Sequence, residues 1–144
     1  MEDHWEFFPC QIEEHPGSVF YNHGISQTIN ESKHQQFIEI QCRLKFPDQD
    51  GLTSDFENQS LFEMEDRIAD FIKQYDGLYV GRVTTNGTRN FLGYLDMEDR
   101  EIGVVMEFLR NKTTYDLQYR VAPDPERQQY WQRLYPRPFE WQII

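Results

Sequence analysis

Two arginines and a threonine on one predicted β-hairpin have the types and spacing in this 144-residue chain that best fit ligand chemistry. The dipeptide Asn86-Gly87 lies between Arg82 and Arg89 and is the commonest signal for a two-residue type I′ turn. In that register Arg82, Thr84 and Arg89 share one face of the hairpin. Guanidinium groups can bind a carboxylate or phosphate, so the three residues are a candidate site for a small anionic ligand. The alternative is that both arginines pair with acids on a neighbouring strand or helix.

The stretch that begins at Phe46 is similar to a calcium-binding loop. Three acidic residues and a glycine fall at later places of an EF-hand register: Asp48, Asp50, Gly51 and Glu57. The first place, which should supply an acidic ligand, is Phe46, and the segment before it has the pattern of a strand. We therefore predict a structural loop without calcium, in which Ser54 and Glu57 form a capping box at the start of a helix.

Histidines and nucleophiles show no pattern that predicts a metal or a catalytic centre. The histidines all lie in the first quarter of the chain and lack the paired spacing of zinc ligands: His4, His15, His23 and His34. The sequence contains no G-x-S-x-G elbow, phosphate-binding loop or G-x-G-x-x-G motif. We therefore predict no metal, no cofactor and no catalytic residue, which favours a protein that is not an enzyme.

Charge and composition restrict the class of partner. The formal net charge is -11, which argues against nucleic acid, because binding to phosphates needs a basic surface. The same charge fits a basic protein partner. No apolar stretch follows Met1 with the length of a signal peptide, and none is long enough to span a membrane. We therefore expect a cytoplasmic protein, with Cys10 and Cys42 as reduced thiols.

Hydrophobic periodicity predicts the elements that must position these residues. The side chains of residues 37–46 alternate between apolar and polar, as in a half-buried strand. Apolar residues recur at steps of three and four in 61–75, which predicts a helix that Gly77 ends. The other predicted elements are strands over 4–12, 18–25 and 115–121, a hairpin over 78–96, and helices over 97–110 and 124–134.

This order of elements predicts a single α+β domain over residues 1–144. Residues 35–122 have the β-α-β-β-α-β order of a ferredoxin-like core, with both long helices on one face of the sheet. Residues 1–34 add an N-terminal β-hairpin and loop, and residues 123–144 add a short C-terminal helix and a tail. The hairpin could cover the other sheet face or leave it open. In the tail, residues 139–144 alternate like a strand and should dock on their own sheet or on a second copy, giving a monomer or a homodimer.

Three stretches of the chain also resemble a known family. They are "DGLTSDFENQSLFEMED" (50–66), "VGRVTTNGTRNFLGYL" (80–95) and "DPERQQYWQRLYP" (124–136). They are similar to domain-of-unknown-function family 695, which in turn is similar to the B-type regulators of ribonuclease E activity. The resemblance implies a ferredoxin-like α+β fold, no established enzyme activity, and an acidic protein that binds and restrains a ribonuclease. The chain ends in "PRPFEWQII" instead of the strongly acidic tail of those regulators.

The sequence therefore favours a non-catalytic cytoplasmic binding or regulatory domain that acts through a protein partner. The second hypothesis is an enzyme or sensor that binds a small anionic ligand with Arg82, Thr84 and Arg89. The third hypothesis is an immunity-type protein, whose acidity would match a basic toxin.

Overall fold

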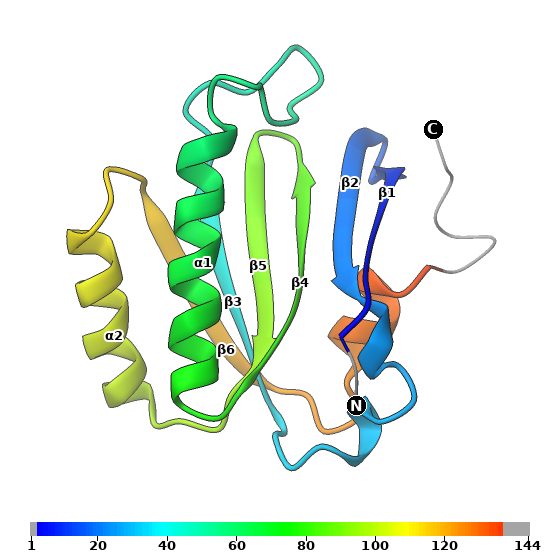
Figure 1. Cartoon of the computed structure of the whole chain (residues 1–144), viewed down its shortest axis with the longest axis vertical. Coiled ribbons are helices and arrows are strands. Elements are labelled where there is room, and N and C mark those ends of the chain that lie inside the picture. Colours follow the sequence, from blue (N-terminus) through cyan, green and yellow to red (C-terminus); the bar gives the residue numbers. More distant parts are fainter. Residues whose placement is uncertain (1–2, 137–144) are drawn as a thin grey trace.

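The computed structural model describes residues 3–136, which form a six-stranded antiparallel sheet with helices on both faces. The strand order is β1-β2-β4-β5-β3-β6 (Figure 1). The strands are β1 (Trp5–Ile12), β2 (His15–Asn22), β3 (Gln36–Arg43), β4 (Leu78–Thr85), β5 (Thr88–Tyr94) and β6 (Leu117–Pro123). The α-helices are α1 (Asn58–Gln74) and α2 (Asp99–Asn111), and the short helices are η1 (His23–Ile25), η2 (Ile29–Glu31) and η3 (Tyr130–Leu134). The predicted α+β class is confirmed, while the predicted docking of the tail lies outside the described residues.

Both long helices cover the same face of the sheet, and their apolar stripes form the larger core (Figure 1). From β3 come the side chains that the alternating pattern placed on one face, including Ile38, Ile40 and Cys42, all at most 1% exposed. The predicted stop of α1 at Gly77 is also observed, since the Gly77 amide donates to the Ile72 carbonyl at 2.8 Å. A Cβ atom at Gly77 would lie 2.7 Å from the Tyr94 carbonyl oxygen, so glycine is required by this close approach.

The N-terminal hairpin extends the sheet instead of lying across its face, because β2 pairs with β4 along its edge. The sheet is therefore larger than the predicted four-stranded core. A second apolar core lies on the face opposite α1 and α2, where the chain after β6 returns to β2 and β4 (Figure 1). Tyr130 of η3 is fully buried there, and its hydroxyl donates to the Asn22 carbonyl at 2.7 Å. This part of the second face is covered by η1, η2 and η3.

Several predicted details of these elements are wrong. Strand β2 begins at His15 instead of 18 and ends at Asn22 instead of 25, and β3 ends at Arg43 instead of 46. The predicted two-residue turn at Asn86-Gly87 is observed, and its register pairs Val83 with Asn90. The same register would pair Tyr79 with Tyr94, but a β-bulge between Tyr79 and Gly81 makes Tyr79 pair with Gly93 instead. The predicted helix over 124–134 begins only at Gln128 and continues as the π-helical segment η3. The buried carboxylate of Asp124 is the cause, because it accepts the amide hydrogens of Gln128 at 2.8 Å and Gln129 at 2.9 Å and so caps the later start.

Candidate functional site

The structure places the predicted arginine site beneath α1. Arg82, Thr84 and Arg89 do share one sheet face, because Thr84 pairs with Arg89 across the hairpin. Arg82 forms an ion pair with Glu65 of α1, and both side chains are largely buried. The second carboxylate oxygen of Glu65 accepts the Tyr79 hydroxyl at 2.6 Å. Arg82 therefore makes the structural contact that the alternative predicted.

Arg89 lies deeper in the same place, with 4% of its surface exposed. Its Nε donates to the Thr84 hydroxyl at 2.9 Å, while its Nη1 has no hydrogen-bond partner within residues 3–136. Burial, and next the nearby charge of Arg82, lower the pKa of Arg89 to about 10. Both arginines are largely buried beneath α1, so anion binding by Arg82, Thr84 and Arg89 stays a prediction to which this geometry adds no support.

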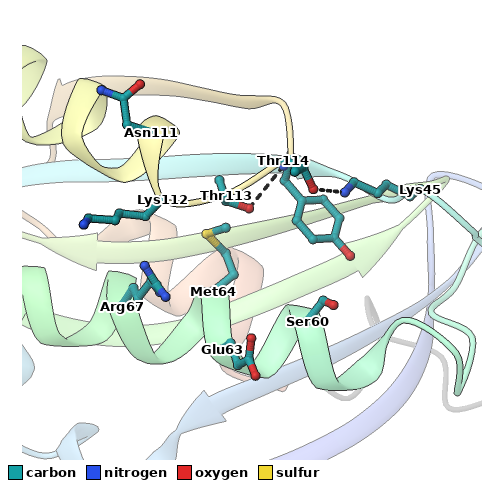
Figure 2. A pocket seen from close by; sticks show the side chains of 10 residues that line it. Lys45, Ser60, Glu63, Met64, Arg67, Asn111, Lys112, Thr113 and Thr114 are labelled. Carbon is teal, nitrogen blue, oxygen red and sulfur yellow. Dashed lines mark hydrogen bonds between the residues drawn. The ribbon is translucent and has the colours of Figure 1, made fainter.

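An open pocket of about 410 Å³ lies instead between α1 and the loop that follows α2 (Figure 2). Its side chains come from the segment after β3, from α1, and from the end of α2 with the loop that follows it. They are mostly polar: Lys45, Ser60, Glu63, Met64, Arg67, Asn111, Lys112, Thr113, Thr114 and Tyr115. Figure 2 shows Arg67 and Lys112 near each other at one end, and Lys45 bonded to Thr114 at the other. This volume is in the usual range of small-molecule sites.

The pocket concentrates positive charge in an acidic chain. Acidic residues outnumber lysine and arginine by 25 to 14, yet the lining holds Lys45, Arg67 and Lys112 against the single acid Glu63. Within the described residues, no carboxylate lies in ion-pair distance of any of these cations. The Lys45 ammonium lies 4.4 Å from the centre of the Tyr115 ring and the Lys112 ammonium 5.1 Å from that of Phe108, so these two cations contact aromatic rings instead of carboxylates.

Glu57 holds the β3 end of the pocket in place. Its carboxylate, 2% exposed, accepts the amide hydrogens of Lys45 at 2.7 Å and Phe46 at 2.9 Å, and the Tyr115 hydroxyl at 2.6 Å. Burial alone would raise the pKa of Glu57, but the hydrogen bonds from Tyr115 and the two amides hold it below its ordinary value. Burial and the bond to Glu57 raise the pKa of Tyr115 well above its usual range. The carboxylate therefore ties strand β3, helix α1 and the loop after α2 together.

This arrangement corrects the predicted capping box. Glu57 is itself the N-cap residue of α1 and makes no side-chain bond to the helix, while the Ser54 hydroxyl is buried without a partner within residues 3–136. The tertiary contacts of Glu57 replace the local contact that the S-x-x-E spacing favoured. The loop before it is held by Asp48, whose carboxylate accepts the amide hydrogens of Asp50 and Leu52 at 2.8 and 3.0 Å.

The side chains of Tyr115 and Lys45 form one wall of the pocket. The Lys45 ammonium lies 4.4 Å from the centre of the Tyr115 ring, a distance typical of a cation–π contact. The Tyr115 amide donates to the Thr113 hydroxyl at 3.1 Å, which orders the loop after α2 (Figure 2). The Lys45 ammonium therefore lies at the edge of the pocket, against the Tyr115 ring and the Thr114 hydroxyl.

An apolar groove of about 580 Å³ lies between α1 and α2 and meets the pocket. Arg67 and Lys112 line both the groove and the pocket. The groove wall on α2 exposes Val104 by 67% and Phe108 by 60%, and the α1 wall exposes Tyr75 by 41%. Such large apolar side chains on a helix surface mark a contact surface when they adjoin one another.

The structure also shows where the histidines and the acidic side chains of the metal predictions lie. Residues 3–136 contain no group of three or more His, Cys, Asp or Glu side chains that could hold a metal ion. His4 and His23 do meet, with ring centroids 6.1 Å apart, on either side of Glu6. No helix in this part of the chain is both long and apolar enough to span a bilayer.

Sequence reasoning missed the pocket because its cations are far apart along the chain. Lys45 follows a strand, Arg67 lies on the polar side of α1, and Lys112 follows α2. Each has the pattern of an ordinary solvated residue. One weak indication of the site is present in the sequence: the stretch "RNKTTY" around Lys112 contains no acidic residue.

Comparison with protein families gives one match. The model of a family of unknown function, DUF695, matches residues 3–135. No curated protein and no solved structure matches the chain.

Proposed function

The chain belongs to the family of unknown function DUF695, and we propose that it is a non-catalytic binding or regulatory domain that acts through a protein partner. The observation that carries the proposal is the apolar groove between α1 and α2. Val104 and Phe108 would be expected on the inside of a protein contact, yet they are 67% and 60% exposed.

The occupant that we propose is an apolar segment of a basic protein. The net charge of -11 attracts a basic partner over long range, and the apolar groove then supplies the contact area. Asp70 lines the groove, and Glu107, next to Phe108, has a side chain that is 69% exposed. These carboxylates could pair with basic residues beside the apolar segment.

We further propose that the unit from β3 to β6 is a ferredoxin-like domain, since its element order is β-α-β-β-α-β and its strands lie in the order β4-β5-β3-β6. The resemblance to the B-type regulators of ribonuclease E activity makes a ribonuclease a specific candidate for the partner, in the cytoplasm. The proposal assigns no catalytic residue.

A capture experiment with matched variants tests the proposed surface. Immobilised wild-type protein, a Val104→Ser/Phe108→Ser variant and a Phe56→Ser variant are incubated with the same lysate, and bound proteins are quantified by mass spectrometry. Phe56 is the control because it is 79% exposed and does not line the groove. We expect a partner that the wild type and Phe56→Ser retain and the groove variant loses, and whose binding weakens with salt.

Binding must then be reproduced with the purified partner. If that partner is a ribonuclease, it should cleave its RNA more slowly when this protein is bound. Circular dichroism melting checks that the groove variant is folded. A partner retained equally by all three proteins would refute the groove as the binding surface. Capture of a second copy of this chain alone would replace the proposed partner with a homodimer.

A further inference from the structure

The pocket beside the groove has a charge that the proposed protein contact does not explain. A protein with an excess of acids normally uses them to neutralise its own cations, and five of its arginines and lysines within residues 3–136 do pair in this way: Lys33, Arg82, Arg110, Arg120 and Arg133. The other lysines and arginines of this range have no such pair, and three of them, Lys45, Arg67 and Lys112, line a single pocket. The lining holds one acid, Glu63, against these three like charges, so an anion between them would reduce their mutual repulsion.

The donors in the pocket fit phosphate better than carboxylate. A phosphate group offers three or more oxygens and up to two negative charges, while a carboxylate offers two oxygens and one charge. The pocket supplies the Arg67 fork, two ammonium groups, and the hydroxyls of Thr113 and Thr114. Both hydroxyls already accept a hydrogen bond, from the Tyr115 amide and from Lys45, so their own hydrogens are free to be donated.

The wall behind these donors is rigid. Glu57 fixes the backbone at Lys45 and the Tyr115 hydroxyl through three hydrogen bonds of 2.6–2.9 Å. A prearranged wall lowers the entropic cost of binding, because fewer side chains must be ordered by the ligand. The volume of about 410 Å³ leaves room for more than the phosphate group itself.

We propose that this pocket binds a small phosphorylated molecule, with its phosphate held by Arg67 and Lys112 and its remaining part extending towards Lys45 (Figure 2). The site is distinct from Arg82, Thr84 and Arg89, which lie beneath α1. Arg67 and Lys112 also line the groove, so the site adjoins the proposed protein surface, but its binding can be measured on the purified chain without the partner.

Isothermal titration calorimetry with inorganic phosphate, pyrophosphate and succinate tests the proposal at low ionic strength. We expect pyrophosphate to bind one site per chain, phosphate to bind more weakly at the same site, and succinate to bind at least about tenfold more weakly than pyrophosphate. The double variant Arg67→Gln/Lys112→Gln should weaken pyrophosphate binding at least about tenfold, since each lost group is a charged hydrogen-bond donor. Lys45→Gln should weaken it as well.

Two further variants separate a site from a general charge effect. Lys73→Gln/Arg100→Gln removes the same charge from exposed positions on α1 and α2 outside the pocket, and it should leave binding within about threefold. Glu63→Gln removes the one acid of the lining and should tighten binding. All of these positions are exposed, so the variants should melt like the wild type.

Three results would overturn the proposal. The first is the absence of saturable pyrophosphate binding at millimolar concentrations. The second is equal weakening in the pocket variant and the Lys73/Arg100 control, which would show that net charge alone is responsible. The third is succinate binding as tightly as pyrophosphate, which would contradict the assignment to phosphate.

Discussion

Glu57→Gln should destabilise the protein far more than loss of one charge at its surface. The change preserves the shape of the side chain but converts one carboxylate oxygen to an NH₂ group. If the remaining oxygen keeps the bonds to the Lys45 amide and the Tyr115 hydroxyl, the NH₂ group faces the Phe46 amide, which lies 2.9 Å from the carboxylate in the wild type. Two donors then meet in a buried place, because Glu57 is 2% exposed.

The expected loss in the free energy of unfolding is the sum of the losses at the three hydrogen bonds of Glu57. An unsatisfied buried amide costs about 1–3 kcal/mol, and each of the two retained bonds loses roughly 1 kcal/mol when its acceptor becomes neutral. The expected loss is therefore about 3–5 kcal/mol, a large part of the roughly 5–15 kcal/mol that stabilises a native domain. In urea this would lower the unfolding midpoint by about 2 M, for a slope of about 2 kcal/mol/M.

Urea denaturation followed by circular dichroism measures this loss, with Glu63→Gln as the matched control. Glu63 is exposed on α1, where its carboxylate accepts a hydrogen bond from Gln59, so the control should stay within about 0.5 kcal/mol of the wild type. A midpoint for Glu57→Gln equal to that of Glu63→Gln would refute the reasoning, because it would show that the buried carboxylate adds no stability.

The pH dependence gives an independent check on the same residue. The pKa of Glu57 is lower in the folded chain than its ordinary value of 4.5, so its charged form stabilises the fold. That stability is fully present above pH 4.5 and is lost as the pH falls through the lower folded pKa. The difference in the free energy of unfolding between the wild type and Glu57→Gln should therefore become smaller below pH 4.5. A difference that is constant down to pH 2 would contradict the assigned ionisation.

Three other predictions follow from buried groups. Ser54→Ala should change the free energy of unfolding by less than about 0.5 kcal/mol in urea denaturation, because the Ser54 hydroxyl caps nothing; a loss above 1 kcal/mol would restore the cap. Arg82→Gln should cost about 3–5 kcal/mol by the same assay, since it leaves the Glu65 carboxylate largely buried without its cation; a loss below 1 kcal/mol would show that water replaces the pair. Burial raises the pKa of Cys10 to about 11 and of Cys42 to about 12, so both thiols should react with a thiol reagent at pH 8 only on unfolding, and fast labelling of the native protein would contradict this.

The arginine hairpin shows where sequence patterns predict well and where they do not. The Asn86-Gly87 turn correctly predicted that Arg82, Thr84 and Arg89 share a face, because turn type fixes the register of adjacent strands. Nothing in the hairpin indicated that α1 would cover that face and bring Glu65 to Arg82, 17 positions away. The accessibility of a polar side chain depends on the element packed over it, which a local pattern does not describe.

The sequence by itself determined the local elements, since alternation and three- to four-residue spacing reflect the geometry of a single strand or helix. The predicted strand, helix and hairpin were therefore found as β3, α1 and β4–β5, although β3 ends at Arg43, before the predicted end at 46. Only the tertiary structure decided that Glu57 binds Tyr115 instead of capping α1, and that Lys45, Arg67 and Lys112 line one pocket with Glu63 as its single acid. These contacts join positions far apart in the chain, and a buried carboxylate bonds to whichever donors the packing brings within about 3 Å. The reason is physical: periodicity records which side of an element is buried, whereas the choice of polar partners depends on how the elements pack.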